Sequence, residues 1–407
     1  MHKVVIIGAG HAGVQLASSL RSEGFLGGIQ VLAREPEFPY QKPPLSKDFL
    51  KGKIAETNLA FRSLDFYEKN NIELNLGVDV ENIEIENQVV LSRNGDKFPF
   101  DQLILATGAE NRILNISGSD LQGICYLRTL QDAQRIKLKV ENAQKIVVIG
   151  GGFIGLELAA AVVAKGKEVV VVEAQDRLMA RVLPPLLTDI FQKEHEDNGV
   201  KFYLNAYADS FTENNGNVSG VILKDKTLIE ADLVLVGVGV LPNTVLAEQI
   251  DLDCDNGVVV NEFMQTSHSN IFSIGDCANH YNFFLQKRIR LESVQNAVDQ
   301  AKTVAKFICG NAQPYHSVPW FWTNQYALKL QMVGFNIDFD KYLIRGDVET
   351  RKFSVVYFKG NKLIGVDSLN KAADHLAARK LIQAGITPSE TDLINTSIKL
   401  KELIPSL

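Results

Sequence analysis

Two copies of a glycine-rich loop constrain the fold of this chain more than any other feature. Each copy follows an apolar strand and leads into a helical pattern, with the spacing G-x-G-x-x-G. The first glycine permits a tight turn, the second lets the backbone approach a pyrophosphate, and the third lets the helix pack closely on the strand. The glycines are Gly8, Gly10 and Gly13 in the first copy and Gly150, Gly152 and Gly155 in the second. Two such units predict two bound dinucleotides.

Later segments complete both copies as nucleotide-binding folds. An apolar strand closes on Gly108 in the first copy, and another closes on Gly239 in the second. Glu173 ends the apolar strand 169–172, about 20 residues beyond the second glycines, where an acid binds ribose hydroxyls. The internal similarity therefore indicates a duplicated function rather than a solenoid repeat.

The rest of the chain predicts a third strand end, a long helix and a C-terminal domain. Residues 271–274 form an apolar strand that runs into Gly275 and Asp276, and residues 293–307 have helical apolar spacing. Beyond residue 318 the predicted elements are strands 341–345, 353–358 and 363–366 and helices 372–384 and 397–404. The predicted fold class is α/β, with two Rossmann-like dinucleotide-binding domains and a C-terminal α+β domain.

Length and composition exclude several classes of protein. The chain has 407 residues, enough for two to three domains of roughly 150 residues. Its 46% hydrophobic and 22% charged residues are typical of a soluble globular protein, and a net charge of −6 without a basic stripe argues against nucleic-acid binding. The apolar runs are far shorter than the ~20 residues of a membrane span. The N-terminus is unlike a signal peptide, so a cytoplasmic location is predicted.

Cysteine and histidine spacing predicts no metal site and no dithiol centre. The four cysteines lie far apart in the sequence, at Cys125, Cys254, Cys277 and Cys309. Residues 40–50 contain no cysteine. The histidines, including His11 in the first loop and His280, have neither metal-ligand spacing nor a Ser/His/Asp signature, and their side chains are predicted to have packing or surface roles.

Longer motifs give the chain a specific resemblance to one family. They are Pro43-Pro44-Leu45-Ser46-Lys47, Leu127-Arg128-Thr129, Gly150-Gly-Gly-Phe-Ile-Gly155-Leu-Glu157, Gly239-Val-Leu-Pro242-Asn243, Gly275-Asp276-Cys-Ala, Glu292-Ser-Val294-Gln-Asn296-Ala and Pro319-Trp-Phe-Trp322-Thr-Asn-Gln-Tyr326. Over essentially its whole length the chain resembles the FAD-dependent, NADH-using ferredoxin reductases of oxygenase systems. These form the putidaredoxin reductase and rubredoxin reductase group of the glutathione-reductase-like superfamily.

The resemblance implies a domain order, two cofactors and a reaction. It implies an FAD domain at 1–111 and 245–318, an NAD domain at 112–244 and a C-terminal interface domain at 319–407. The enzyme would take hydride from NADH onto non-covalently bound FAD. It would then pass electrons singly to a [2Fe–2S] ferredoxin or a rubredoxin that feeds an oxygenase, such as a cytochrome P450 or a ring hydroxylase. The identity of that partner and the formation of a homodimer are left open.

The resemblance also assigns residues to the two cofactors. Those implied for FAD are Gly8, Gly10, His11, Ala12, Gly13, Arg34, Glu35, Lys42, Lys47, Val80, Ala106, Thr107, Gly108, Arg128, Gly275, Asp276 and Val294. Those implied for NADH are Gly150, Gly152, Phe153, Ile154, Gly155, Glu173 and Gly239. Arg34 stands where relatives often carry aspartate, so three interpretations are open. Glu35 takes over the adenosine ribose, Arg34 lies on adenine, or Arg34 faces solvent.

Three residues are implied in the chemistry. Family counterparts of Lys47 and Glu157 meet beside flavin N5, which gives this pair electrostatic and gating roles. Trp322 is either a lining of the electron exit or an ordinary core tryptophan. Glu173 predicts NADH over NADPH, because its carboxylate accepts both ribose hydroxyls and repels a 2′-phosphate.

Two other functions and one docking hypothesis complete the predictions. The alternatives are another NADH:acceptor oxidoreductase, similar to monodehydroascorbate reductase or NADH oxidase, and a redox-sensing interaction protein similar to apoptosis-inducing factor. An acidic ferredoxin would need a local basic patch on this acidic chain. The candidates for that patch are Arg62, Lys287, Arg288, Arg290 and Lys302.

Overall fold

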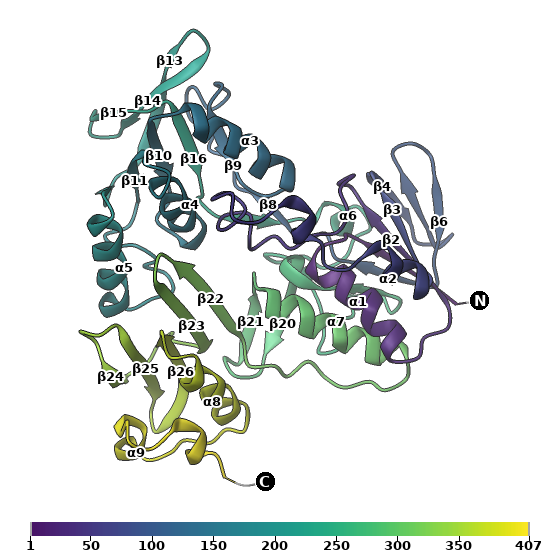
Figure 1. Cartoon of the computed structure of the whole chain (residues 1–407). Helices are drawn as coiled ribbons and strands as arrows, with labels where there is room; N and C mark the ends of the chain where they lie inside the picture. The colour runs from purple at the N-terminus through teal and green to yellow at the C-terminus, as the bar shows by residue number, and fades with distance from the viewer. Residues whose placement is uncertain (1, 406–407) are drawn as a thin grey trace. The chain divides into compact units, whose positions relative to one another are not determined.

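The computed structural model describes residues 2–405, which divide into two compact units (Figure 1). Unit 1 comprises residues 2–42, 56–110 and 240–317, and unit 2 comprises residues 43–55, 111–239 and 318–405. Two short strands lie where the chain passes between the units, β8 (Ala109–Asn111) and β17 (Val240–Pro242). The division into FAD, NAD and interface domains stays a prediction.

A parallel five-stranded sheet forms the centre of unit 1. Its order is β19-β7-β1-β2-β3, with every neighbouring pair parallel. The strands are β1 (Lys3–Ile7), β2 (Gly28–Ala33), β3 (Ile72–Leu76), β7 (Gln102–Leu105) and β19 (Ile271–Ser273). Runs such as Val4-Val-Ile-Ile7 suit this position, because β-branched residues favour strands and a parallel sheet is covered on both faces. The register pairs Ile7 with Leu32 and Leu105, so the carboxyl ends of these strands share one edge.

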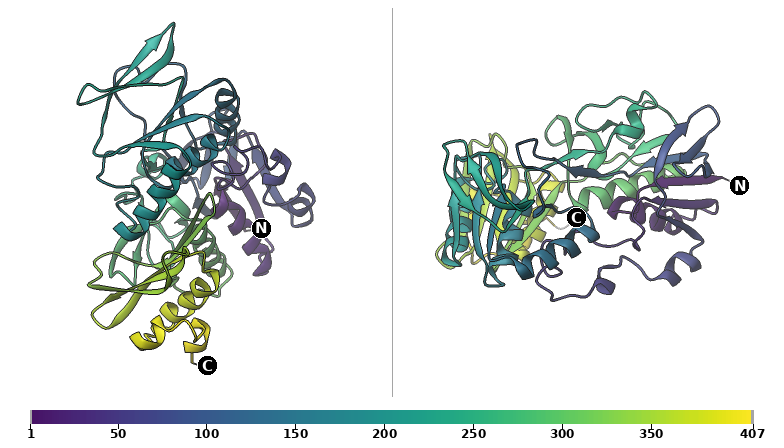
Figure 2. Two further views of the ribbon diagram at one scale, coloured as in Figure 1. Left: turned by 60° about the vertical axis from the view of Figure 1, so that its left-hand side comes forward. Right: turned by 90° about the horizontal axis from the view of Figure 1, so that it is seen from above.

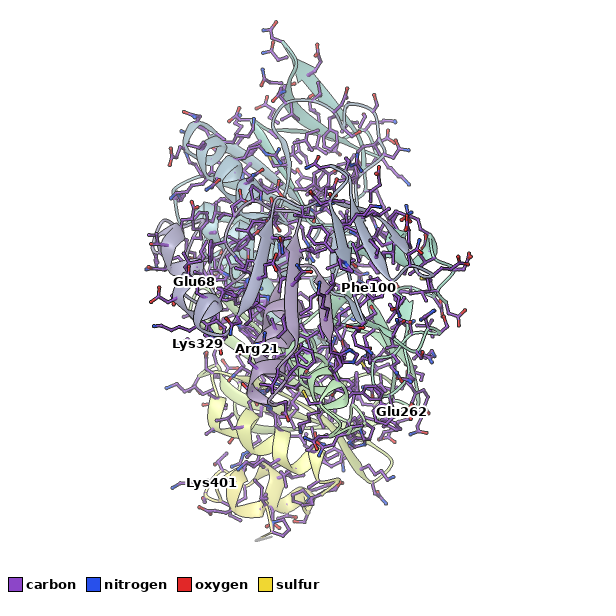
Figure 3. All side chains as sticks on the ribbon, turned by 90° about the vertical axis from the view of Figure 1, so that its right-hand side faces the viewer. Arg21, Glu68, Phe100, Glu262, Lys329 and Lys401 are labelled. Atoms are coloured by element: carbon purple, nitrogen blue, oxygen red, sulfur yellow. The ribbon has the colours of Figure 1, made fainter. Side chains whose placement is uncertain are left out.

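Two helices from distant parts of the sequence pack together in unit 1. They are α1 (His11–Ser22) and α7 (Val294–Ile308), which lie side by side in purple and green in Figure 1. Leu16 and Leu20 of α1 and Ala301 and Val304 of α7 belong to one buried core. Arg21 ends α1 by donating hydrogen bonds to main-chain carbonyls of the two loops beside it (Figure 3).

Smaller elements complete unit 1. The helices are α2 (Leu64–Lys69) and α6 (Val245–Glu248), with 3-10 turns η1 (Glu56–Leu59) and η2 (Gly275–Cys277). One antiparallel sheet contains β4 (Val80–Glu84), β5 (Val89–Ser92) and β6 (Lys97–Pro99). Another sheet contains β18 (Val258–Val259), β20 (Ala278–Asn282) and β21 (Lys287–Arg290).

Unit 2 repeats the parallel sheet of unit 1. The order is β12-β11-β10-β16-β9, formed by β9 (Ile124–Tyr126), β10 (Lys145–Ile149), β11 (Glu168–Val172), β12 (Val200–Tyr203) and β16 (Leu233–Val236). Its helices are α3 (Leu130–Asn142), α4 (Phe153–Val163) and α5 (Pro185–Asp197). Helix α4 is apolar on almost every face, and most of its residues are buried. A small antiparallel sheet contains β13 (Ala208–Asn214), β14 (Asn217–Leu223) and β15 (Leu228–Glu230).

The C-terminal part of unit 2 is an antiparallel sheet with helices. Figure 2 shows it in yellow and light green. Its order is β22-β23-β26-β25-β24, formed by β22 (Trp320–Gln325), β23 (Leu328–Gly334), β24 (Lys341–Asp347), β25 (Lys352–Lys359) and β26 (Lys362–Leu369). Helix α8 (Ala372–Gln383) packs on β26 and β23. The predicted fold class is confirmed, as are the three C-terminal strands and the helix predicted at 372–384.

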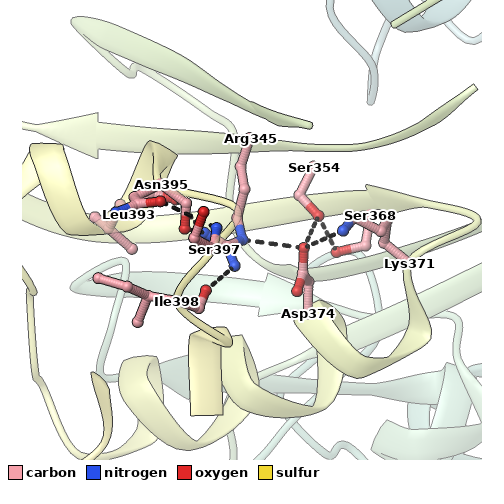
Figure 4. Close-up of polar contacts among 9 residues, drawn as sticks. All are labelled: Arg345, Ser354, Ser368, Lys371, Asp374, Leu393, Asn395, Ser397 and Ile398. Atoms are coloured by element: carbon pink, nitrogen blue, oxygen red, sulfur yellow. Dashed lines mark hydrogen bonds and ion pairs between the residues drawn. The ribbon is translucent and has the colours of Figure 1, made fainter. Parts of the chain in front are cut away.

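The predicted helix at 397–404 is wrong. The structure has α9 (Glu390–Ile394) before this segment and only a 3-10 turn, η3 (Leu400–Leu403), within it. The buried guanidinium of Arg345 accounts for the difference (Figure 4), because it takes the carbonyls of Leu393, Asn395 and Ile398 at 2.9, 2.7 and 2.5 Å. An α-helix over 397–404 would need the Ile398 carbonyl for its own hydrogen bonds.

Candidate cofactor sites and active site

The first glycine loop joins β1 to α1 and leaves space at its second glycine. A Cβ atom at Gly8 would lie 2.2 Å from the carbonyl oxygen of Ala106, and one at Gly13 would lie 1.9 Å from that of Gly8. A Cβ at Gly10 would meet no described atom within 4 Å. Gly10 is the N-cap of α1 and makes no side-chain cap hydrogen bond. Room for a phosphate and a helix dipole that favours negative charge therefore coincide here.

The second loop, between β10 and α4, reproduces this geometry. A Cβ at Gly150 would lie 2.4 Å from the carbonyl oxygen of Gly237, and one at Gly155 would lie 2.0 Å from that of Gly150. Around Gly152 there is again no described atom within 4 Å of such a Cβ. Both loops thus fit the pyrophosphate of a dinucleotide.

Glu173 lies beside the second loop, at the carboxyl end of β11. Its carboxylate accepts hydrogen bonds from the main-chain N–H groups of Gly151 at 2.5 Å and Gln175 at 2.8 Å. The nearby Arg177 donates to the carbonyls of Ala180 and Leu183. That guanidinium is therefore engaged by the main chain, and the carboxylate is fixed next to the glycine loop.

Glu35 lies just beyond the carboxyl end of β2 and has different partners. Its carboxylate accepts a hydrogen bond from the Tyr40 hydroxyl and pairs with the Lys42 ammonium at 3.0 Å. Arg34 is exposed, whereas Glu35 is half-buried. This arrangement favours Glu35 as the ribose acid and brings Lys42, also assigned to FAD, into direct contact with it.

Other residues assigned to FAD gather at the same edge of the unit 1 sheet. The Thr107 hydroxyl donates to the Asn243 carbonyl at 2.7 Å, and the Asn243 N–H donates to the Gly108 carbonyl at 3.0 Å. Ala106 continues directly from β7. The motif around residue 243 is therefore tied to the loop that follows β7.

Asp276 lies at this edge too, just after β19. Within residues 271–280 it is the one residue that is not buried. The preceding Gly275 has a φ of 81°, a conformation that favours glycine, and its N–H donates to the side-chain oxygen of Gln300 at 2.7 Å. Its Cα also lies close to Ala12, because an added Cβ would be 3.1 Å from the Ala12 Cβ. The loop thus presents the Asp276 side chain away from the core.

Five further positions assigned to the cofactors lie at element ends or in loops. Val294 is the first residue of α7, whose N-cap Ser293 accepts a hydrogen bond from the Asn296 N–H. Val80 begins β4, and Gly239, with a φ of 108°, precedes β17. Arg128 precedes the capping box of α3 and belongs to unit 2. The ring of His11 packs edge-on against Phe61, with centroids 4.6 Å apart.

Lys47 and Glu157 form a close ion pair within unit 2. The Lys47 Nζ lies 2.6 Å from Glu157 Oε2, which also accepts a hydrogen bond from the Ser46 hydroxyl at 2.6 Å. The other oxygen, Oε1, accepts a hydrogen bond from the Thr323 hydroxyl at 2.7 Å. Glu157 is only 3% exposed. A buried carboxylate needs such partners, because charge is costly to remove from water.

An aromatic group lies near this ion pair on β22. Trp322 is half-buried, and its ring centroid is 5.5 Å from that of Trp320 and 6.2 Å from that of Phe321. Phe321 in turn contacts Phe153 at the start of α4, at 4.9 Å. Ile154 is 46% exposed at the same helix start. The partial exposure of Trp322 argues against a purely core role.

The structure corrects part of the proposed basic patch. The side chain of Arg290 is only 9% exposed, pairs with Glu292 at 2.8 Å and donates to the Asp276 carbonyl, so it is a structural residue. Arg288 donates to the carbonyls of Val260 and Asn279. Lys302 pairs with Asp299 at 3.7 Å. Sequence position alone could not show these partners.

Two features were sought among the described residues, a group of side chains able to hold a metal ion and a helix able to cross a membrane. All four cysteines are free thiols, and no group of three or more His, Cys, Asp or Glu within residues 2–405 could hold a metal ion. No helix in this range combines the length and apolar character needed to cross a bilayer.

Sequence reasoning missed several residues around the ion pair. Ser46 and Thr323 both donate to Glu157, and Gln325 donates to Thr323 at 3.2 Å. The sequence did contain a pointer to these residues, because Ser46 lies in the Pro43–Lys47 motif and Thr323 and Gln325 lie in the Pro319–Tyr326 motif. Recognising their roles required knowing that these motifs meet at Glu157.

Comparison with known proteins decides the family. Residues 2–301 match the model of the pyridine nucleotide-disulphide oxidoreductase family, and residues 320–404 match the reductase C-terminal model. The chain belongs to the pyridine nucleotide-disulphide oxidoreductase family. Membership implies FAD and NAD(H) as cofactors and makes the chain an oxidoreductase.

Curated relatives are similar over nearly the whole chain. Rhodocoxin reductase of Rhodococcus erythropolis is 42% identical over 98% of this chain and 93% of its own length. Rubredoxin-NAD(+) reductase of Pseudomonas putida is 41% identical over 90% of this chain and 95% of its own length.

Solved structures agree with this family. The ferredoxin reductase for the CYP199A2 system from Rhodopseudomonas palustris has a TM-score of 0.97 at 40% identity and covers 100% of both chains. The covalent complex of putidaredoxin reductase with putidaredoxin has a TM-score of 0.95 at 35% identity, covering 99% of this chain and 98% of that one. A water-forming NADH oxidase from Lactobacillus brevis, 20% identical with a TM-score of 0.88, shares the fold alone.

Proposed function

We propose that this chain is a ferredoxin or rubredoxin reductase of an oxygenase system, which takes hydride from NADH onto non-covalently bound FAD and delivers electrons singly. The observation that carries the proposal is its similarity, over nearly the full length, to reductases named for rhodocoxin, rubredoxin and putidaredoxin. Residues 40–50 contain no cysteine, and the four cysteines are unpaired. An exit through an internal disulfide therefore has no support.

The unit 1 loop is the proposed FAD site. The open space at Gly10, the start of α1, the acid Glu35 with Lys42, and the accessible Asp276 would hold the dinucleotide. When bound, FAD supplies the chemistry that side chains lack, accepting a hydride and releasing single electrons. The start of α7 at Val294 offers main-chain N–H groups and a positive dipole end, which would stabilise negative charge on the ring.

The unit 2 loop is the proposed NADH site. Its acid, Glu173, is fixed by main-chain N–H groups, and it has no ion-pair partner within residues 2–405. Its negative charge is therefore uncompensated and would repel a 2′-phosphate while accepting ribose hydroxyls. This arrangement supports NADH as the preferred donor.

Three residues have proposed roles in electron transfer. Lys47 and Glu157 would act electrostatically on hydride transfer as a fixed pair of charges, because the buried carboxylate holds the ammonium in one place. Trp322 would line the exit toward the iron–sulfur partner. Of the basic candidates for docking, four are exposed and stay predictions: Arg62, Lys287, Arg288 and Lys302.

Steady-state kinetics with different acceptors test this function. The purified, yellow protein is mixed with NADH and with a [2Fe–2S] ferredoxin, a rubredoxin or dioxygen, and NADH oxidation is compared with acceptor reduction. We expect two moles of one-electron acceptor reduced per mole of NADH and slow use of dioxygen. Fast dioxygen consumption with no reduction of iron–sulfur proteins would instead support an oxidase of the same fold.

A further inference from the structure

A chain of buried hydrogen bonds runs from Glu157 to a histidine that no motif singled out. Thr323 donates to Glu157 at 2.7 Å, and Gln325 Nε2 donates to the Thr323 hydroxyl at 3.2 Å. Gln325 Oε1 contacts His195 Nε2 at 2.8 Å, and His195 Nδ1 contacts the Tyr326 hydroxyl at 3.0 Å. Glu157, Thr323, Gln325 and His195 are each at most 3% exposed.

The chain joins elements that are distant in sequence but belong to unit 2. Glu157 lies on α4, His195 on α5, and Thr323 and Gln325 on β22. Alternate residues of a strand point to one face, so Thr323 and Gln325 share a face. Their buried polar side chains would be costly in that position without partners. The complete set of bonds removes that cost.

The direction of every bond follows from the carboxylate. An ionised carboxylate only accepts hydrogen bonds, so the Thr323 hydroxyl must donate to Glu157 and must accept from the amide nitrogen of Gln325. The amide oxygen of Gln325 then faces His195, which must carry its proton on Nε2. Neutral His195 therefore accepts from the Tyr326 hydroxyl at Nδ1. Burial lowers the pKa of His195 to about 4, which agrees with a neutral ring.

We propose that Thr323, Gln325 and His195 are positioning residues that fix the orientation of the Glu157 carboxylate toward the Lys47 ammonium. The Thr323 hydroxyl holds Oε1, so that Oε2 faces Lys47 and Ser46. The ammonium is thereby held in one place, as catalytic groups require. This inference rests on the proposed role of the Lys47–Glu157 pair in hydride transfer from NADH.

Two substitutions at one position separate the hydrogen bond from packing. Thr323→Val keeps the side-chain shape and removes the hydroxyl, whereas Thr323→Ser keeps the hydroxyl. We expect the rate of flavin reduction by NADH, measured by stopped flow, to fall about ten-fold in Thr323→Val, the size expected for a lost hydrogen bond to a charged group. The KM for NADH should change less than about two-fold, and Thr323→Ser should recover most of the rate. Equal rates in Thr323→Val and the unmodified enzyme would overturn the proposal.

A second readout does not depend on activity. In protein labelled with ¹⁵N-histidine, the signal of His195 is assigned by its loss in His195→Gln. We expect the Nε2-protonated tautomer, neutral down to about pH 5 because of the lowered pKa. An Nδ1-protonated ring, or one charged at pH 6, would contradict the deduced bond directions, even if Thr323→Val failed to fold.

Glu157→Gln distinguishes failure of this inference from failure of the proposed function. If Glu157→Gln reduces flavin as fast as the unmodified enzyme, the pair has no role in hydride transfer and the inference falls with it. If Glu157→Gln is slow and Thr323→Val is not, the role of the pair stands and the positioning by Thr323 is refuted.

Discussion

The two glycine loops have the same backbone geometry but hold their acids differently. Glu35, after β2, pairs with the Lys42 ammonium, whereas Glu173, after β11, accepts hydrogen bonds from main-chain N–H groups. Glu35 thus has a cationic partner, while Glu173 has no ion-pair partner among residues 2–405. On the proposed function, loop geometry would provide dinucleotide binding in both units, and the partners of the acid would decide whether an additional phosphate is rejected.

The largest expected effect comes from filling the open space in one loop at a time. Gly152→Ala should weaken use of NADH on the order of 10²-fold in kcat/KM while FAD stays bound, because the new Cβ occupies the space proposed for the pyrophosphate. Gly10→Ala should instead release FAD. Flavin content and NADH kinetics measure both effects. As a control, Gly28→Ala, whose Cβ would make an ordinary 3.6 Å contact with Lys3, should change neither.

A smaller effect is expected from neutralising the uncompensated acid. Glu173→Gln should narrow the preference for NADH over NADPH by about 1–3 kcal/mol, roughly five- to 150-fold in the ratio of the two kcat/KM values, because it removes the repulsion of the 2′-phosphate. Glu35→Gln is the matched variant and should leave the preference unchanged. Equal use of both nucleotides by the unmodified enzyme would contradict the role of Glu173.

The ion pair of the first loop should make a modest contribution. Lys42→Met should weaken FAD binding about two- to five-fold, because partly exposed salt bridges contribute up to about 1 kcal/mol. Lys53, exposed in unit 2, provides a neutral comparison as Lys53→Met. Dissociation of FAD, followed by flavin fluorescence, measures the change. Unaltered FAD retention in Lys42→Met would show that Glu35 does not need its partner.

A third carboxylate, Asp367 of unit 2, extends the comparison, because it also has only neutral donors but is deeply buried. Asp367 is 3% exposed and accepts hydrogen bonds from the Tyr357 hydroxyl at 2.7 Å and the Asn336 amide at 3.2 Å. Burial raises its pKa to about 7, so the folded state holds a proton that the unfolded chain, with a pKa of about 3.9, releases. Stability should therefore fall as the pH rises from about 4 to about 7.

Asp367→Asn tests the expected fall in stability with pH, and we expect this substitution to have little effect on activity. The variant should lack this loss of stability, so its Tm should exceed that of the unmodified protein by several degrees at pH 8 and by much less at pH 5. Asp340→Asn makes the same change from carboxylate to amide at an exposed site and is the control. A pH-independent difference in Tm would mean that Asp367 is ionised in the folded protein throughout this range.

Strand and helix positions could be predicted from the sequence where local residue patterns determine the backbone conformation. The β-branched runs before Gly8 and Gly150 form the central strands, and the apolar spacing at 293–307 corresponds to α7 within one residue. These features depend on local periodicity and on glycine sterics, which are visible in the chain itself.

Prediction failed where a buried polar side chain organises distant segments. Arg345 donates to the Ile398 carbonyl, in the segment where the helix 397–404 was predicted. Arg290 donates to the Asp276 carbonyl. Thr323 and Gln325 form the hydrogen bonds that link Glu157 to His195. Arg345, Arg290 and Thr323 look like ordinary polar residues in the sequence. The bonds from Arg345 to Ile398, from Arg290 to Asp276 and from Thr323 to Glu157 span 53, 14 and 166 positions. No local pattern encodes such separations.

Single-turnover transfer to an iron–sulfur protein tests the central claim most directly. The FAD-loaded protein is reduced with one equivalent of NADH and mixed anaerobically with excess [2Fe–2S] ferredoxin, with rubredoxin in a parallel experiment. Flavin and iron–sulfur absorbance are then followed together. The account predicts two reduced ferredoxins or rubredoxins per flavin. Retention of both electrons until dioxygen is admitted, with neither protein reduced, would contradict it.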